Sequence, residues 1–371
     1  MSDRPGFFSK RSTRRFLAEL EAFKPELLHL HNIHGYYLHL PLLFDYIRQT
    51  NIPVVWTLHD RWAYTGHCAH YCMDIQDDEE IPTECIQWKT GCTKCHHKHS
   101  YPKSWFINRS KKNWDEKNAL FSGLANTVLV TPSFWLKQEV QQSFLQAYPT
   151  YCIPNGLDLR TFSPMPKTQQ NFILKKYNLP INQNSTILLS VASTWYEEKG
   201  LFDLLSLADN LGSSYTLILV GVTKQQREQY KRSNLIAIER TENTDDLRAF
   251  YAAADLYISL SHSESMGMTL LEALACGTQV LSYNITALPE IITDDVGMTV
   301  PFQDEQATVQ AVIDMTQHPK DAQACVARAQ AYELNARYET YLQLYEGMYH
   351  NASGGLRPYH AKGVDPLQTD E

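Results

Sequence analysis

Residues 256–283, LYISLSHSESMGMTLLEALACGTQVLSY, decide the fold. LYISLS and QVLSY are short β-rich apolar runs, whereas MTLLEALAC has the apolar spacing of a helix and SHSESMG is polar. Gly277 follows the helical pattern and predicts its end. A strand, a loop, a helix and a second strand in this order are typical of a parallel sheet, so we expect an α/β protein.

The same alternation continues on both sides of this stretch. Between residues 186 and 301 it predicts a complete doubly wound, Rossmann-like domain with the strands TILLSVA, YTLILVG, LIAIER, LYISLS, QVLSY and GMTVP. The first part of the chain has fewer strand candidates, which are ELLHLH (26–31), PVVWTLH (53–59), NTVLVTP (126–132) and YCIPN (151–155).

The length of 371 residues suggests two domains. We expect an N-terminal Rossmann-like domain over residues 1–165 and a C-terminal one over 166–325, with the polar, Pro-containing stretch 161–171 as a linker. A helical pattern over 326–350 follows, and the Gly-rich polar tail 351–371 is expected to be disordered.

Composition excludes several functional classes. The net charge of −8 argues against a nucleic-acid partner. No apolar run is long enough to span a bilayer, and the basic N-terminus lacks the apolar core of a signal peptide. We expect a cytoplasmic protein, whose eight cysteines would be reduced or metal-bound rather than paired in disulfides.

The polar loop and the helix after LYISLS place two carboxylates near the carboxyl end of a strand, where doubly wound domains bind ligands. Backbone N–H groups of Gly267, Met268 and Thr269 would face a phosphate or a sugar oxygen. Glu264 and Glu272 could each accept hydrogen bonds from sugar hydroxyls. Alternatively, Thr269-x-x-Glu272 is a capping box, and Glu264 is an ordinary loop residue.

Lys199 lies in VASTWYEEKGLFDLL, between a predicted strand and a helix that begins near Gly200. A lysine is unfavourable at the positive end of a helix unless an anion binds there. The alternative is a solvated lysine that Glu197 and Glu198 neutralise.

Together these motifs resemble the retaining glycosyltransferases of family 4. Residues 241–292 contain the family's two glutamates with seven residues between them, and the resemblance extends to EKG (198–200), IPNGLD (153–158) and VVWTLHDRWAYTGHC (54–68). It covers roughly residues 10 to 350, and W-x-x-GC-x-x-C (88–95) adds a likeness to transferases that build bacterial exopolysaccharide. The resemblance implies the GT-B fold, in which two Rossmann-like domains face a cleft.

The resemblance also implies a role for each site residue. Glu272 would bind the ribose of a nucleotide-sugar, Glu264 would hold the transferred sugar, and Lys199 would neutralise the diphosphate of the leaving group. Backbone N–H groups for the sugar and the diphosphate would come from Gly267, Met268 and Thr269. His59 would face the reacting sugar, with Asp60 and His31 as weaker candidates.

In this family the sugar is transferred with retention of configuration, and no catalytic metal is needed. The resemblance therefore implies a UDP- or GDP-sugar donor and a glycan or lipid-linked acceptor. It also implies a place in cell-surface polysaccharide biosynthesis, with peripheral contact at the inner membrane face.

The sequence departs from the family at two points. Ser193 stands where the family commonly has an Arg that pairs with the EKG lysine on the diphosphate, so we expect altered phosphate contacts. The family's first domain normally has further βα units before ELLHLH, which predicts an incomplete N-terminal domain here. Two alternatives therefore remain open, which are an inactive relative that only binds the donor and a nucleotide-sugar epimerase.

Residues 60–125 form a Cys- and His-rich insertion. Cys92-x-x-Cys95 has the spacing of half a structural zinc site, and Cys68 and Cys85 are the preferred partners. Other nearby candidates are Cys72, His67, His70, His96, His97 and His99. The alternative is a set of thiols without a metal.

Overall fold

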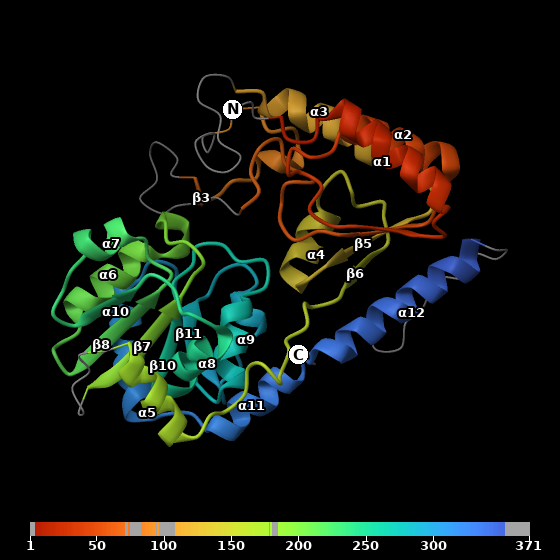
Figure 1. Cartoon of the computed structure of the whole chain (residues 1–371). Coiled ribbons are helices and arrows are strands. Elements are labelled where there is room, and N and C mark those ends of the chain that lie inside the picture. The colour runs from red at the N-terminus through yellow and green to blue at the C-terminus, as the bar shows by residue number, and fades with distance from the viewer. Residues whose placement is uncertain are drawn as a thin grey trace. The chain divides into compact units, whose positions relative to one another are not determined.

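The computed structural model describes residues 4–70, 73–74, 83–93, 95, 108–177, 179 and 185–352. The chain divides into two compact units (Figure 1). The first unit comprises Met1–Pro154 together with Tyr338–Glu371, and the second comprises Asn155–Arg337.

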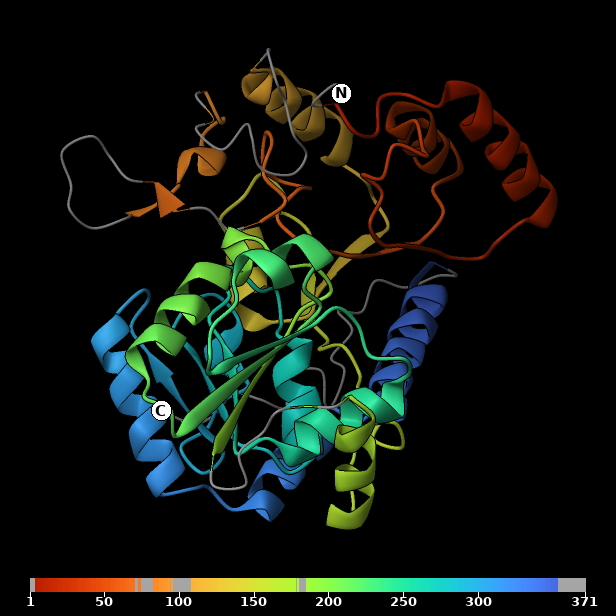
Figure 2. The same ribbon diagram turned by 60° about the vertical axis from the view of Figure 1, so that its left-hand side comes forward.

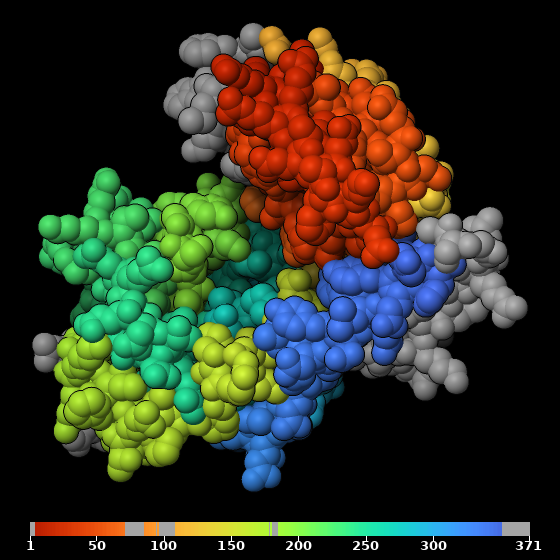
Figure 3. All heavy atoms as spheres, turned by 45° about the vertical axis from the view of Figure 1, so that its right-hand side comes forward, coloured from red at the N-terminus to blue at the C-terminus, as the bar shows by residue number. Residues whose placement is uncertain are grey.

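The first unit is built on a parallel sheet with the strand order β1-β2-β5-β6. Its strands are β1 (Leu28–Leu30), β2 (Val54–Thr57), β5 (Thr127–Thr131) and β6 (Thr150–Cys152). The helices are α1 (Lys10–Phe23), α2 (Leu40–Thr50), α3 (Ser110–Phe121) and α4 (Phe134–Gln141). All four residues of β2 are buried, as expected for a strand covered on both faces. Helices α1 and α2 pack together, and their red to orange atoms are prominent in the part of the first unit that Figure 3 shows.

The described residues between β2 and α3 include three short elements. These are the antiparallel pair β3 (Met73–Asp74) and β4 (Thr83–Glu84), and the 3₁₀ helix η1 (Gln87–Lys89). This region is the predicted insertion.

The second unit contains a parallel sheet with the order β12-β11-β10-β7-β8-β9, the Rossmann arrangement predicted from the sequence. Its strands are β7 (Thr186–Val191), β8 (Tyr215–Val220), β9 (Leu235–Ile238), β10 (Leu256–Ser259), β11 (Val280–Tyr283) and β12 (Gly297–Val300). Its helices are α5 (Lys167–Lys176), η2 (Glu197–Lys199), α6 (Leu201–Asn210), α7 (Lys224–Gln229), α8 (Thr244–Ala253), α9 (Met268–Ala275), η3 (Leu288–Glu290), α10 (Glu305–Gln317) and α11 (Ala322–Gln330). Helices α6 and α10 cover one face of the sheet, and α8 and α9 lie on the other (Figure 2).

The structure differs from the expected domain organisation at three points. The first unit ends at Pro154 rather than at residue 165. The predicted linker 161–171 runs into α5, which packs on α8, where Ile173 becomes buried. The single helical pattern 326–350 is two helices, α11 and α12 (Leu334–Ala352).

Helix α12 returns the chain to the first unit. An apolar stripe at helical spacing, which includes Tyr341, Leu344 and Tyr345, packs against the sheet residues Val55 and Val130. The tail from residue 353 onward lies outside the described residues. Within the part of the chain that the structure describes, no helix combines the length and hydrophobicity that crossing a membrane requires.

Candidate active site

A cavity of about 270 Å³ opens at the carboxyl ends of β7 and β10 in the second unit. These two strands are neighbours in the sheet but not in the sequence, so the cavity lies at the switch point where doubly wound sheets bind ligands. The lining contains six of the predicted site residues, which are Ser193, Lys199, Glu264, Gly267, Met268 and Thr269.

The N-terminus of α9 forms one wall of this cavity. Gly267 is the N-cap residue, with a φ of 92°, a left-handed conformation that glycine adopts without strain. Glycine has no side chain with which to cap the first amides of the helix. The N–H groups at this end can therefore serve a bound anion.

The capping-box alternative for Thr269 and Glu272 is wrong. A capping box would make Thr269 the N-cap residue of α9. The N-cap residue is instead Gly267, two residues earlier, and no side chain caps the helix. Glu272 instead accepts a hydrogen bond of 2.6 Å from the hydroxyl of Tyr251, on helix α8. Burial raises the pKa of Glu272 to about 7, although the bond from Tyr251 opposes this effect. Glu272 is not part of the lining of the cavity, but it lies on the helix that begins there.

Lys199 is held at the cavity by the geometry of the EKG turn. It ends η2, and Gly200 follows with a φ of 74°. A Cβ atom on Gly200 would lie 2.0 Å from the carbonyl oxygen of Leu260, so only glycine fits there without displacing the backbone. The lysine thereby reaches Glu264, in the loop that follows β10.

The partner of Lys199 is Glu264 rather than the neighbouring Glu197 or Glu198. Its Nζ atom lies 2.5 Å from Oε1 of Glu264. Burial alone would lower the pKa of Lys199, but the charge and the hydrogen bond of Glu264 outweigh it and the pKa is raised. The cavity therefore contains a cation and an anion in contact, each only partly exposed.

Asn155 is a lining residue that the site prediction missed. It stands in IPNGLD, which contributed to the family resemblance, and its backbone N–H donates to Sδ of Met266 at 3.1 Å. The hydroxyl-bearing residues Ser190, Ser259, Ser261 and Ser265 also line the cavity. Most of these serines lie at the end of a strand or directly after it, and this position in the sequence could have predicted them.

The predicted histidine lies in the first unit. His59 follows β2, and its Nε2 atom is 2.9 Å from Nδ1 of His31, which follows the neighbouring strand β1. Burial lowers the pKa of His59, and the proximity of His31 lowers it further. The third candidate, Asp60, is bound to Nε2 of His34 at 2.9 Å and accepts a hydrogen bond from the backbone N–H of Trp62.

The preferred cysteines also lie in the first unit. Cys68, Cys85, Cys92 and Cys95 line one small cavity. Among the residues that the structure describes, no three His, Cys, Asp or Glu side chains are already placed to hold a metal ion together. Four of the other predicted candidates, Cys72, His96, His97 and His99, lie outside the described residues.

Comparisons with known proteins match both halves of the chain. Residues 172–332 match the model for glycosyl transferases group 1, and residues 2–161 match the model for glycosyltransferase family 4. The putative colanic acid biosynthesis glycosyl transferase WcaC of Escherichia coli (strain K12) is 24% identical over 299 residues, which cover 77% of this chain and 66% of that relative. This chain therefore spans just under two thirds of the length of that relative.

Solved structures resemble the described fold over most of the chain. Sucrose-phosphate synthase from Thermosynechococcus elongatus has a TM-score of 0.67 at 20% identity, and the match covers 92% of this chain and 78% of that one. Anabaena Alr3699/HepE, in complex with UDP-glucose, has a TM-score of 0.63 at 15% identity, with 90% and 82% covered.

Proposed function

The chain belongs to the family 4 glycosyltransferases and has the GT-B fold, and we propose that it transfers a sugar from a nucleotide-sugar to a glycan or lipid-linked acceptor. The observation that carries the proposal is the cavity where β7 and β10 diverge, with Lys199, Glu264 and the start of α9 in its lining. A cation and free helix amides suit a diphosphate, and carboxylates suit sugar hydroxyls.

The proposed roles follow from the position of each group. Lys199 binds the diphosphate and stabilises the charge that develops as the glycosidic bond breaks. Glu264 holds the hydroxyls of the transferred sugar, and Glu272 those of the ribose. The backbone amides of α9 bind the sugar and the diphosphate, while the hydroxyl of Ser193 gives the phosphates a neutral contact.

We further propose that transfer occurs with retention of configuration and contributes to cell-surface polysaccharide. The name of WcaC supports this class of product. UDP and GDP are the two donor nucleotides to test, and UDP-glucose is the molecule bound in the HepE complex. His59 is assigned to turnover rather than to donor binding.

Ligand-induced stabilisation tests the donor site first. The full chain is heated with UDP, with GDP and without nucleotide. A ligand at 100 times its Kd stabilises the folded state by about 2.7 kcal/mol, so one nucleotide should raise the Tm by several degrees. If neither does so at millimolar concentration, the donor-site proposal is wrong.

Product analysis then tests the reaction. The chain is incubated with radiolabelled sugar nucleotide and a bacterial membrane extract as the source of acceptors. We expect the labelled sugar to appear in a glycan, joined by a linkage that has the anomeric configuration of the donor. An epimerised nucleotide-sugar, or nucleotide binding without any turnover, would support the respective alternative and overturn the transfer proposal.

A further inference from the structure

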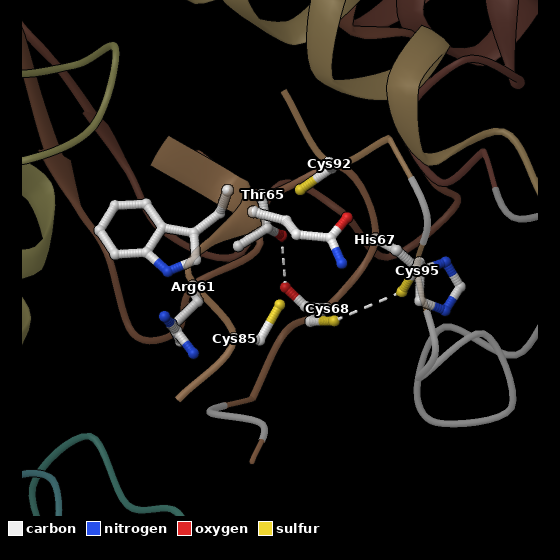
Figure 4. Close-up of a pocket in the computed structure, with 9 residues that line it drawn as sticks. Arg61, Thr65, His67, Cys68, Cys85, Cys92 and Cys95 are labelled. Carbon is white, nitrogen blue, oxygen red and sulfur yellow. Dashed lines mark hydrogen bonds between the residues drawn. The ribbon is translucent and has the colours of Figure 1, made fainter. Parts of the chain in front are cut away.

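The first unit contains a second, much smaller cavity whose lining is rich in sulfur. Cys68, Cys85, Cys92 and Cys95 all contribute to it, although they come from separate positions between β2 and α3 (Figure 4). Its volume is about 20 Å³, which is space for about one water-sized particle. The proposed transfer reaction uses none of these residues.

The spacing of one pair of sulfur atoms fits a zinc ion. Sγ of Cys68 lies 3.8 Å from Sγ of Cys95. Zinc binds thiolates at about 2.3 Å, so two sulfurs of a tetrahedral site are about 3.8 Å apart. Cys85 and Cys92 line the same cavity, and rotation about the Cα–Cβ bond of each residue between staggered rotamers would bring its sulfur towards the ion.

The backbone around Cys92 is packed in a way that suits a metal ligand. The N–H group of Gly66 donates to Sγ of Cys92 at 3.1 Å, a bond that orients the sulfur and stabilises negative charge on it. A Cβ atom on Gly66 would lie 2.7 Å from Cβ of Cys92 and 2.3 Å from the carbonyl oxygen of Ser110. A glycine is therefore required for this close approach.

The charges near the cavity are complementary to a zinc–thiolate group. Four thiolates around one Zn²⁺ carry a net negative charge. Lys117 is 2% exposed, and its ammonium donates to the carbonyl oxygens of Trp62 and Thr65, in the loop that continues into Gly66 and Cys68. A buried ammonium is costly without negative charge nearby; Asp60 already acts on it, and the zinc site would add further negative charge.

We propose that Cys68, Cys85, Cys92 and Cys95 bind one structural zinc ion as four thiolates. Each thiol loses its proton to solvent when the metal binds, and the closed set of four sulfurs leaves no open position for a substrate. Thiolate ligands select zinc or an iron–sulfur cluster, and a cavity of about 20 Å³ accommodates one ion rather than a cluster. The ion would tie together the described stretches 58–70, 83–93 and 95, which carry these four cysteines.

Metal analysis of the full chain tests the proposal. The protein is purified under reducing conditions without chelator, and its metals are measured by plasma mass spectrometry. We expect about one zinc per chain. Replacement by Co²⁺ should give the visible absorption of a tetrahedral site and strong sulfur-to-cobalt charge transfer. Cys92→Ser and Cys68→Ser should contain little zinc, whereas Cys325→Ser, a buried cysteine of the second unit, should retain it.

The wild-type measurement remains decisive even if the variants fail to fold. The proposal is overturned if the wild-type chain binds no stoichiometric zinc after incubation with Zn²⁺ and desalting. It is equally overturned by iron with acid-labile sulfide, or by a Cys68–Cys95 disulfide in place of a metal. None of these results bears on nucleotide binding, which the Tm shift with UDP or GDP measures separately.

Discussion

Lys199 and Glu264, 65 residues apart in the sequence, form an ion pair of 2.5 Å in the lining of the second unit's cavity. The contact joins the turn after β7 to the loop after β10, the two strands between which the cavity opens. If a diphosphate binds as proposed, Lys199 would also offset the repulsion between the diphosphate and the carboxylate of Glu264. We therefore expect Lys199 to contribute to binding of the diphosphate and Glu264 to binding of the transferred sugar.

Lys199→Ala should weaken UDP binding without weakening uridine binding. The substitution removes the cation from the diphosphate and leaves Glu264 unpaired beside it. A charged hydrogen bond contributes about 1.5–3 kcal/mol, so the Kd for UDP should rise about 10- to 100-fold. Calorimetry with both ligands measures this difference. Lys175→Ala, on the exposed side of α5, is the matched control. An equal loss for uridine and UDP would remove Lys199 from the phosphate site.

Glu272→Ala should weaken the binding of uridine as much as the binding of UDP, because the proposed contact is to the ribose that both ligands contain. Two hydrogen bonds to a carboxylate are lost, and we expect at least about a 10-fold rise in both Kd values. Glu239→Ala, an exposed carboxylate, should bind both ligands normally. Unchanged uridine affinity in Glu272→Ala contradicts the ribose assignment.

The pKa of Glu272 makes a prediction about stability without any ligand. Its folded-state pKa of about 7 is above the ordinary value of 4.5, so the folded chain retains a proton that the unfolded chain releases. The retained proton contributes to the free energy of unfolding, and this contribution is fully present below pH 4.5. It is lost as the pH rises towards 7, at about 1.4 kcal/mol per pH unit and about 3 kcal/mol in total. Urea unfolding at a series of pH values should show this decline in the wild type and a flatter profile in Glu272→Gln. Parallel profiles would contradict the pKa shift.

The strands were predictable because buried parallel strands are continuous apolar runs. VVWT and LYIS are buried at every position, and the structure places β2 and β10 over them. Strand ends in turn predicted side chains at this edge of the sheet, and Lys199 and Glu264 both line the cavity there. The Rossmann order of the second sheet follows from the same alternation.

Contacts between distant residues were not predictable. Nothing local in the sequence pairs Tyr251 with Glu272, since the contact depends on how α8 packs beside α9. Helix α5 was missed because only a few of its positions are buried, so its polar composition resembles a linker. The return of α12 to the first sheet likewise depends on a stripe whose partners lie about 200 residues earlier, at Val130 for example.

His59→Ala should reduce kcat far more than it changes nucleotide affinity. Burial and His31 lower the pKa of His59, so the ring is largely neutral at pH 7. A neutral ring can donate a hydrogen bond to a reacting group or accept one from it. Loss of such a contact costs about 100-fold in kcat. Steady-state kinetics and UDP calorimetry on the same preparation separate the two effects. His318→Ala, an exposed histidine, should match the wild type. A loss of UDP affinity as large as the loss of kcat would contradict the assignment to turnover.

Gly200→Ala should destabilise the second unit and remove the donor site with it. Alanine is strained at a φ of 74°, and its Cβ atom would lie 2.0 Å from the carbonyl oxygen of Leu260, so the EKG turn must move away from β10. Strain of this kind costs about 1–3 kcal/mol, and the displaced turn carries Lys199 away from Glu264. Gly212→Ala is the matched control, because the nearest atom to its Cβ, Oγ of Ser214, lies at 4.0 Å. Urea unfolding and UDP calorimetry should both distinguish the two variants. If Gly200→Ala is as stable as Gly212→Ala and binds UDP normally, the turn does not position Lys199 in the way proposed.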